Sequence, residues 1–324
     1  MNKFSVTVSA PGKLMLFGEH AVIYGRPCIV TAVNQRMHVC VEKTAGDLII
    51  INAPEVGIGN FSAKISELGK TGYPKETKFV LKAVENFFKK YKVSSGLKIE
   101  VESEFSSQFG FGSSSAVTVC MVKALSVVFD IQVTNKSLFD IAYKTVLDIQ
   151  GVGSGFDLAA AIWGGTLYFT FGGKTVKPIN LKTLPLIVGY TGIKADTANL
   201  IRQVAKLRKG DKKHVDKIFD SIGKISEKAV SFLETSDFRK LGALMNENQK
   251  LLTQIGVSSE KLDALITAAV GSGAYGAKLS GAGGGDCMIS VADPILTNLI
   301  KKAITKSGGT VLDVKSNAEG VKIE

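Results

Sequence analysis

Three loops rich in glycine and serine constrain this 324-residue chain more than any other feature of its sequence. They span residues 110–116, 151–157 and 280–286, and each lies between stretches patterned like regular secondary structure. Glycine lets backbone N–H groups approach an anion without a Cβ in the way, and a helix N-terminus adds partial positive charge. One such loop is weak evidence, because tight turns also need glycine. Three in one chain reinforce each other and favour a site for phosphate groups.

The pattern between these loops predicts a mixture of strands and helices, an α+β fold. Alternating apolar residues in the first third favour strands, and apolar residues three and four apart favour helices further along. Thr134 or Asn135 is a capping candidate at the start of one predicted helix. Predicted strands cover residues 4–8, 28–33, 37–42, 47–51 and 97–102, and predicted helices cover residues 75–91, 116–129 and 137–149.

A break after a predicted hairpin indicates a domain boundary. The hairpin joins strands at residues 165–171 and 175–180, and Leu184-Pro185 then interrupts the pattern. We therefore predict an N-terminal domain over residues 1–184 and a second α+β domain over residues 185–324, since the chain is longer than one typical domain. The second domain is predicted to contain a strand at 186–190, helical segments at 197–255, 259–270 and 295–306, and further strands between the helices.

Composition excludes several classes of protein. Hydrophobic residues make up 45% and charged residues 21%, so a folded globular protein is expected. The four cysteines form no Cys-x-x-Cys pair and there are three histidines, which argues against a zinc cluster or a disulfide framework and fits a reducing cytoplasm. Neither a leader nor a membrane-spanning pattern is evident, so we expect a cytoplasmic protein with no membrane partner.

The formal charge of +11 favours an anionic partner, such as a nucleotide, an acidic metabolite or a nucleic acid. Lysines on solvated helix faces explain most of this charge, as in residues 206–217, where basic residues mix with aspartates. No nucleic-acid-binding module is recognisable, so we expect no nucleic-acid partner.

The loop at 110–116 leads directly into a predicted helix, which is the geometry that anion binding needs. Ser113, Ser114 and Ser115 add hydroxyls that suit phosphate or Mg²⁺. A series of serine N-caps is the alternative interpretation of the same residues.

Two charged residues beside the loops are candidates for the reaction itself. Asp157 follows the second loop and precedes an apolar run, so its carboxylate could accept a hydroxyl proton, although an N-cap role is also open. Lys13 lies at the end of the first predicted strand. It could pair with Asp157 or with a transferring phosphoryl group, where it would neutralise charge in the transition state. Taken alone, it would be an ordinary surface lysine.

Together these segments resemble the GHMP kinase family, which includes galactokinases, homoserine kinases, mevalonate kinases and phosphomevalonate kinases. The resemblance covers nearly the whole chain and rests on three ordered motifs, at residues 11–25, 110–116 and 278–285. It implies an ATP-dependent small-molecule kinase that uses Mg²⁺. It also implies an N-terminal ribosomal-protein-like α+β domain, a C-terminal ferredoxin-like domain, and an active site in the cleft between them.

The motifs differ in the acceptor that they suggest. Residues 16–25 resemble mevalonate kinases, whereas residues 150–160 and 285–287 look more like phosphomevalonate kinases. We expect mevalonate as acceptor and ATP as donor, because Glu19 and His20 belong to the segment expected to touch the acceptor. 5-Phosphomevalonate, another family acceptor, a decarboxylase reaction and a non-catalytic role stay open, as does a homodimer.

The resemblance also implies roles for individual residues. Asp157 matches the catalytic aspartate, Lys13 its basic neighbour, and Ser114 the serine that binds Mg²⁺. A glutamate that serves as a second Mg²⁺ ligand in mevalonate kinases falls at Val146, and the nearby Asp148 would face another side of a regular helix. The implied acceptor-binding residues are Lys13, Glu19, His20, Asp157 and Thr191, and the implied ATP-binding residues are Gly110, Gly112, Ser113, Ser114, Ser115, Ala116, Gly281, Gly283 and Gly284.

Overall fold

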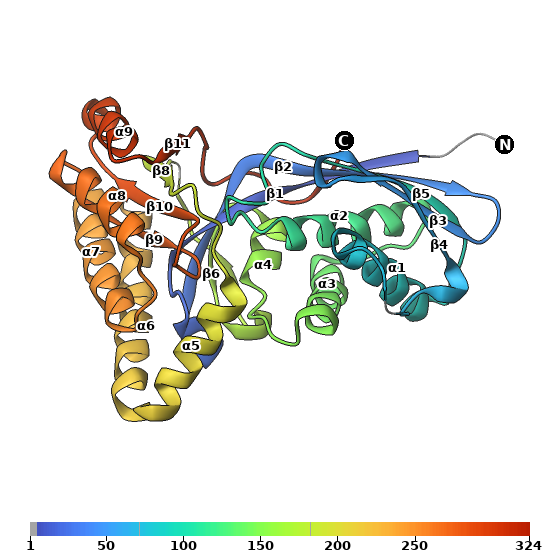
Figure 1. Ribbon diagram of the computed structural model, residues 1–324, viewed down its shortest axis with the longest axis horizontal. Helices are drawn as coiled ribbons and strands as arrows, with labels where there is room; N and C mark the ends of the chain where they lie inside the picture. The colour runs from blue at the N-terminus through green and yellow to red at the C-terminus, as the bar shows by residue number, and fades with distance from the viewer. Residues whose placement is uncertain (1–4, 71, 182) are drawn as a thin grey trace.

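Two long antiparallel strands, β1 (Ser5–Phe17) and β2 (Cys28–Thr44), form the frame of the first part of the molecule (Figure 1). The computed structural model describes residues 5–70, 72–181 and 183–324. The pairing of the two strands shifts register between Pro11 and Gly12 and again after Met15, and such irregularities bend a strand. Beyond the first irregularity every residue of β1 is buried, which is why the apolar pattern there does not alternate.

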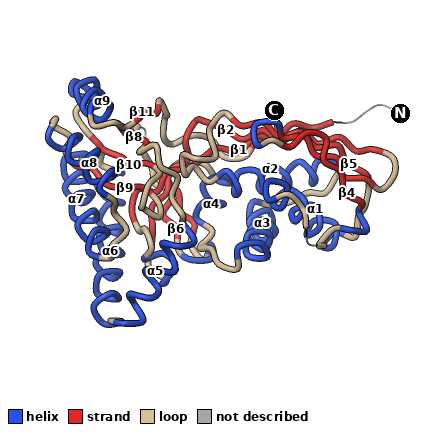
Figure 2. The backbone as a smooth tube through the Cα atoms, viewed as in Figure 1, coloured by secondary structure: helices blue, strands red, loops and turns tan. Residues whose placement is uncertain are grey.

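Six shorter strands complete the first sheet of the described chain: β3 (Leu48–Ala53), β4 (Ile58–Lys64), β5 (Gly96–Ser103), β6 (Thr166–Phe169), β7 (Val176–Pro178) and β12 (Lys322–Ile323). Their order is β12-β1-β2-β5-β3-β4, and β6 pairs with β2 and β7. One face is covered by the helices α1 (Lys78–Tyr91), α2 (Ser113–Val128), α3 (Asn135–Gln150) and α4 (Phe156–Trp163) (Figures 1 and 2). The middle helix α2 packs directly on β1 and β2.

The second sheet contains β8 (Leu186–Tyr190), β9 (Gly276–Ser280), β10 (Cys287–Val291) and β11 (Thr310–Leu312), all antiparallel, in the order β11-β8-β10-β9. Helices connect its first strand to its second and its third to its fourth, which is the ferredoxin-like arrangement expected from the sequence. These helices are α5 (Thr197–Gly210), α6 (Lys212–Glu234), α7 (Phe238–Gln254), α8 (Glu260–Gly271) and α9 (Thr297–Lys306). None of the helices in the described ranges is long and apolar enough to cross a membrane.

The two parts are joined at the buried end of β1. The Ser280 hydroxyl at the end of β9 accepts a hydrogen bond from the Met15 N–H and donates one to the Met15 carbonyl, both at 3.0 Å. The last strand, β12, returns to the first sheet and pairs with β1. The predicted boundary at residues 184 and 185 falls between β7 and β8, which lie in different sheets, and it stays a prediction.

Most of the predicted elements are confirmed, and the exceptions have physical reasons. The strands predicted at 28–33 and 37–42 are one continuous strand, β2, because the backbone between them stays paired instead of turning. The Asn34 N–H donates to the Lys315 carbonyl at 2.9 Å, and Arg36 pairs with Pro11 of β1. Strand β4 was not predicted. The helix predicted from residue 116 begins at Ser113, after Gly112 adopts a left-handed φ of 81°. Phe4, in the first predicted strand, lies outside the described residues.

Candidate active site

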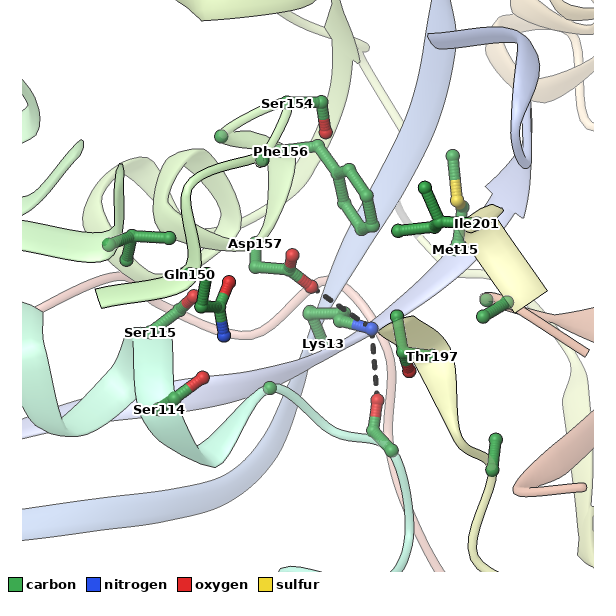
Figure 3. A pocket seen from close by; sticks show the side chains of 18 of the residues that line it. Lys13, Met15, Ser114, Ser115, Gln150, Ser154, Phe156, Asp157, Thr197 and Ile201 are labelled. Atoms are coloured by element: carbon green, nitrogen blue, oxygen red, sulfur yellow. Dashed lines mark hydrogen bonds and ion pairs between the residues drawn. The ribbon is translucent and has the colours of Figure 1, made fainter. Parts of the chain in front are cut away.

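A cavity of about 450 Å³ opens where the two parts of the molecule meet. The first part contributes the end of β1, the start of α2 and the loop before α4, and the second part contributes the loops after β8 and β9. Figure 3 shows Lys13 in the middle, with Asp157 on one side and Thr197 on the other. The three glycine- and serine-rich loops recognised in the sequence therefore converge on one cavity.

Lys13 is fixed by its neighbours. Its Nζ lies 3.0 Å from Asp157 Oδ1 and donates to the Gly110 carbonyl at 2.9 Å. The same ammonium lies 5.3 Å from the centroid of the Phe156 ring. The side chain is 9% exposed, because this end of β1 is buried. The ammonium thus reaches the cavity as a buried, well-positioned charge rather than as the surface group that lysine usually is.

Asp157 lies in the first turn of the short helix α4. The helix begins after Gly155, whose φ of 91° suits glycine, and it is otherwise packed into the core by small apolar residues. Gly155 is the N-cap and no side chain caps the helix, so Asp157 is not an N-cap. Its side chain is 31% exposed. A carboxylate on a rigid helix therefore faces the cavity, where it can accept a proton or orient a hydroxyl.

The loop before α2 brings backbone close to this ion pair. A Cβ placed on Gly112 would lie 3.3 Å from Lys13 Cε and 3.5 Å from Asp157 Oδ1, at a φ of 81°. The Lys13 N–H donates to the Phe111 carbonyl at 3.0 Å, which fixes the loop against β1. The first N–H groups of a helix lack intrahelical partners, so the N-terminus of α2 offers donors to an anion beside Lys13.

The serines of this loop line the cavity from the first turn of α2. Figure 3 shows the hydroxyls of Ser114 and Ser115 on the same side of the cavity as Asp157, and Ser113 also lines it. Because Gly112 is the N-cap, these serines are not a series of caps. The side chain of Ala116 is packed in the core and is absent from the cavity lining, and its expected role in binding ATP stays a prediction.

His20 and Glu19 are adjacent in the chain but lie in different surroundings. His20 lines the cavity, and its Nε2 lies 2.9 Å from the Ala282 carbonyl, so this nitrogen carries a proton and donates it. Burial lowers the pKa of His20 below its ordinary value, which favours the neutral ring. Glu19 is fully buried outside the lining, where it pairs with Lys278. Glu19 therefore lies outside the cavity lining in this structure, and its contact with the acceptor stays a prediction.

Two further expectations concern residues outside the cavity lining, and they stay predictions. The Thr191 hydroxyl is turned into the protein and lies 3.0 Å from the Asp286 carbonyl, away from the cavity lining. Of the last glycine loop, Gly281 lines the cavity, whereas Gly283 and Gly284 do not. A Cβ on Gly283 would lie 2.0 Å from the Val257 carbonyl oxygen, and one on Gly284 would lie 2.9 Å from Leu200 Cδ1. A side chain larger than glycine would force neighbouring atoms to shift at either position, and the expected contact of both glycines with ATP stays a prediction.

Asp286 and Lys194 line the cavity and were not assigned a place in it from sequence. Asp286 Oδ1 accepts from the Ala195 N–H at 2.9 Å, and burial raises its pKa, a rise that this hydrogen bond opposes. Lys194 lies in the loop between β8 and α5. The sequence signal was weak for both: Asp286 follows a glycine run, and Lys194 precedes the N-cap Asp196.

The structure also places the residues near the expected second Mg²⁺ ligand. Val146 lines the cavity, so an apolar side chain occupies that wall. Asp148 points elsewhere, since its carboxylate binds Lys144 at 2.7 Å and Asn86 at 2.9 Å. Gln150 lines the cavity one turn after Val146, and Figure 3 shows its amide between Ser115 and Asp157.

Comparison with known proteins identifies the family. The sequence matches the families described as GHMP kinases N terminal domain, over residues 78–165, and GHMP kinases C terminal, over residues 229–309. A mevalonate kinase from Thermococcus gammatolerans is 35% identical in an alignment of 331 positions that covers 98% of each chain. The chain belongs to the GHMP kinase family. Its two-domain GHMP kinase fold, expected from the motifs, is thereby confirmed.

Solved structures of GHMP kinases share this fold along nearly the whole chain. The mevalonate kinase of Methanococcus jannaschii is 26% identical, with a TM-score of 0.83 over 96% of this chain and 98% of that one. The L. major mevalonate kinase, solved in complex with R-mevalonate, is also 26% identical, with a TM-score of 0.79 over 98% and 97% of the two chains. The fold is therefore one that supports phosphoryl transfer to small molecules.

Proposed function

We propose that this protein transfers the γ-phosphoryl group of ATP to the primary hydroxyl of mevalonate. The observation that carries the proposal is the Lys13–Asp157 pair, which lies at 3.0 Å in a cavity beside the N-terminus of α2. The full-length relative from Thermococcus gammatolerans, named as a mevalonate kinase, supports the choice of acceptor.

In the proposed reaction the mevalonate hydroxyl lies against Asp157. Its oxygen forms a bond to the γ-phosphorus while the bond from that phosphorus to the ADP oxygen breaks, and the hydroxyl proton passes to the carboxylate. Lys13 lies beside the carboxylate and neutralises charge on the transferring group. The hydrogen bond from Lys13 to the Gly110 carbonyl keeps the ammonium in place, so little reorganisation is needed.

The ATP phosphates are proposed to lie over the loop before α2. Positive φ angles at Gly110 (72°) and Gly112 (81°) turn this backbone around Lys13, and the helix N-terminus follows at once. Gly281 faces the cavity from the second part, with no atom within 4 Å of a built Cβ, so a phosphate can approach its backbone closely.

The cavity fits Mg²⁺ bound mainly through phosphate. No cluster of three or more His, Cys, Asp or Glu residues that could hold a metal occurs among the described residues. Mg²⁺ in kinases typically uses one or two protein ligands together with phosphate oxygens and water, so a site with few carboxylates suits it. The Ser114 hydroxyl would be the protein ligand, and the ion would neutralise charge on the β- and γ-phosphates.

An acceptor panel tests the proposal. The purified protein is incubated with Mg-ATP and one of mevalonate, 5-phosphomevalonate, galactose or homoserine, and ADP release is followed. We expect release with mevalonate well above that with any other acceptor. Release driven mainly by galactose or homoserine would overturn the proposed acceptor while leaving a GHMP kinase, and no release with any acceptor would remove the evidence for catalysis.

A further inference from the structure

The charges that line the cavity are few enough to account for one by one. In the part of the chain that the structure describes, the ionisable residues in the lining are Lys13, His20, Asp157, Lys194 and Asp286. Lys13 is committed to Asp157 and to the Gly110 carbonyl. The acceptor proposed above carries a carboxylate, and burying a carboxylate without a cationic or hydrogen-bonding partner is costly. A partner for it must therefore be found among the other groups.

His20 is poorly suited to bind that carboxylate as a cation. Its Nε2 already donates to the Ala282 carbonyl at 2.9 Å, and the buried ring favours its neutral form. Arg26, a cation six residues after His20 in the chain, is outside the lining. Its guanidinium binds Asp220 at 2.8 Å and 3.0 Å and the Tyr24 carbonyl.

Lys194 is exposed to the cavity, and the backbone on both sides of it is anchored. The Asp286 N–H donates to the Ile193 carbonyl at 2.7 Å, and Asp286 Oδ1 accepts from the Ala195 N–H at 2.9 Å. Among the described residues the Lys194 ammonium has no ion pair within 4.0 Å. Burial raises the pKa of Asp286, and the charge of Lys194 opposes this rise at longer range. Its loop ends at Thr197, which Figure 3 shows on the side of Lys13 opposite to Asp157.

We propose that Lys194 is a specificity-determining residue that binds the carboxylate of the acceptor. The inference rests on the proposed function, because it assumes an acceptor with a hydroxyl at one end and a carboxylate at the other. With the hydroxyl at Asp157, the chain of the acceptor extends toward the wall formed by the loop between β8 and α5. A single ammonium matches a single carboxylate, whereas a phosphorylated acceptor would call for more cations at that end.

A charge-removing variant combined with a neutral acceptor isolates this contact. We compare the wild type with Lys194→Met, using (R)-mevalonate and its primary amide, in which the carboxylate is replaced by an uncharged group. We expect Lys194→Met to lower kcat/KM for mevalonate by roughly tenfold or more, mostly through KM, since a hydrogen bond between charged groups contributes about that much. The kcat/KM for the amide and the KM for Mg-ATP should change less than about twofold.

Two matched variants serve as controls. Lys194→Arg keeps the positive charge and should retain most of the activity with mevalonate. Lys209→Met removes an exposed lysine from the last turn of α5, the helix that follows the Lys194 loop, and should leave both acceptors unaffected.

Other outcomes would overturn the inference in distinguishable ways. Equal losses with mevalonate and its amide would assign Lys194 a role in loop structure, and no loss with mevalonate would remove it from the acceptor site. In both cases the wild type still phosphorylates mevalonate, so the proposed function survives. A wild type that fails to phosphorylate mevalonate would overturn the proposed function and this inference together.

Discussion

At the scale of single residues, the proposed chemistry depends on an ion pair whose two members come from distant parts of the chain. Lys13 lies on a strand that is buried at this end, and Asp157 lies in the first turn of a buried helix. Neither backbone can move without disturbing the core, so the 3.0 Å separation is set before any substrate binds.

Replacing Asp157 with Asn tests the proposed proton acceptor. The change keeps the shape but removes the carboxylate, so turnover should fall by roughly 10²-fold or more, while ATP affinity changes little. Steady-state turnover and nucleotide binding measure the two effects. Asp140→Asn, at an exposed position of α3 paired with Lys136, is the matched control and should be silent. Near-wild-type turnover in folded Asp157→Asn would remove Asp157 from the mechanism.

Removing the hydroxyl of Ser114 tests the proposed Mg²⁺ ligand. Ser114→Ala should raise the Mg²⁺ concentration needed for half-maximal turnover and lower the maximum, whereas Ser115→Ala should be milder. Mg²⁺ titrations at fixed ATP give the comparison. Greater sensitivity of the Ser115 variant would mean that the neighbouring hydroxyl holds the ion.

Val146→Glu is a companion variant that places a carboxylate where mevalonate kinases have a second Mg²⁺ ligand. An unchanged Mg²⁺ dependence would show that another group already fills that ligand position.

The buried ring of His20 should make stability depend on pH. Because its pKa is lowered in the folded state, the unfolded chain binds the proton more readily, so stability is lost as pH falls below about 6.5. His20→Gln keeps a donor for the Ala282 carbonyl but removes this titration. Urea unfolding at about pH 7.5 and about pH 5.5 should show a larger loss for the wild type than for the variant. Equal losses would contradict a buried, neutral His20.

At the scale of elements, the end of β1 and strand β9 are held together by polar groups inside the core. Lys278 pairs with Glu19, both fully buried, and Asn248 also donates to Glu19 at 3.4 Å. Burial raises the pKa of Glu19, and the adjacent ammonium of Lys278 opposes this rise. The Glu19–Lys278 pair lies close to His20 and Gly281 in the chain and holds their segments in place, although neither member of the pair lines the cavity.

Breaking this pair should be costly. Lys278→Met leaves the Glu19 carboxylate buried without its partner, and such changes cost roughly 3–5 kcal/mol. Urea unfolding of the wild type and the variant measures the difference in the free energy of unfolding. Lys240→Met, which breaks the exposed pair with Asp237, is the control and should have little effect. Equal effects of the two substitutions would contradict the importance of the buried pair.

The sequence predicted the elements better than it predicted the surroundings of single side chains. Helical periodicity located most of the helices. The strand predicted at 4–8 stops before Lys13, which lies further along the same strand, and the short helix that carries Asp157 was anticipated only as an apolar run. The burial of Glu19 and Thr191 could not be predicted, because a motif gives their order in the chain but not the direction in which each side chain points. Lys194 was not assigned a role from the sequence, because only the tertiary structure distinguishes a lysine that lines the cavity from the many lysines on solvated surfaces.

At the scale of the whole molecule, the cavity exists only because two α+β parts meet. The first contributes the Lys13–Asp157 pair and the loop before α2, and the second contributes Gly281 and Lys194. The two parts are held together by the hydrogen bonds between Ser280 and Met15. The pairing of β12 with β1 adds a second connection. Acceptor preference is therefore a property of the assembled molecule, because Asp157, proposed to bind the acceptor hydroxyl, and Lys194, proposed to bind its carboxylate, come from different parts.

The most direct test of the central claim is the ratio of kcat/KM for (R)-mevalonate to that for (R)-5-phosphomevalonate, measured with the same Mg-ATP concentration. A cavity with one uncommitted ammonium should favour the unphosphorylated acid. We predict a preference for mevalonate of at least about tenfold, which corresponds to about 1.4 kcal/mol of differential transition-state binding. A preference for the phosphorylated acceptor would contradict the account and would make the protein a phosphomevalonate kinase.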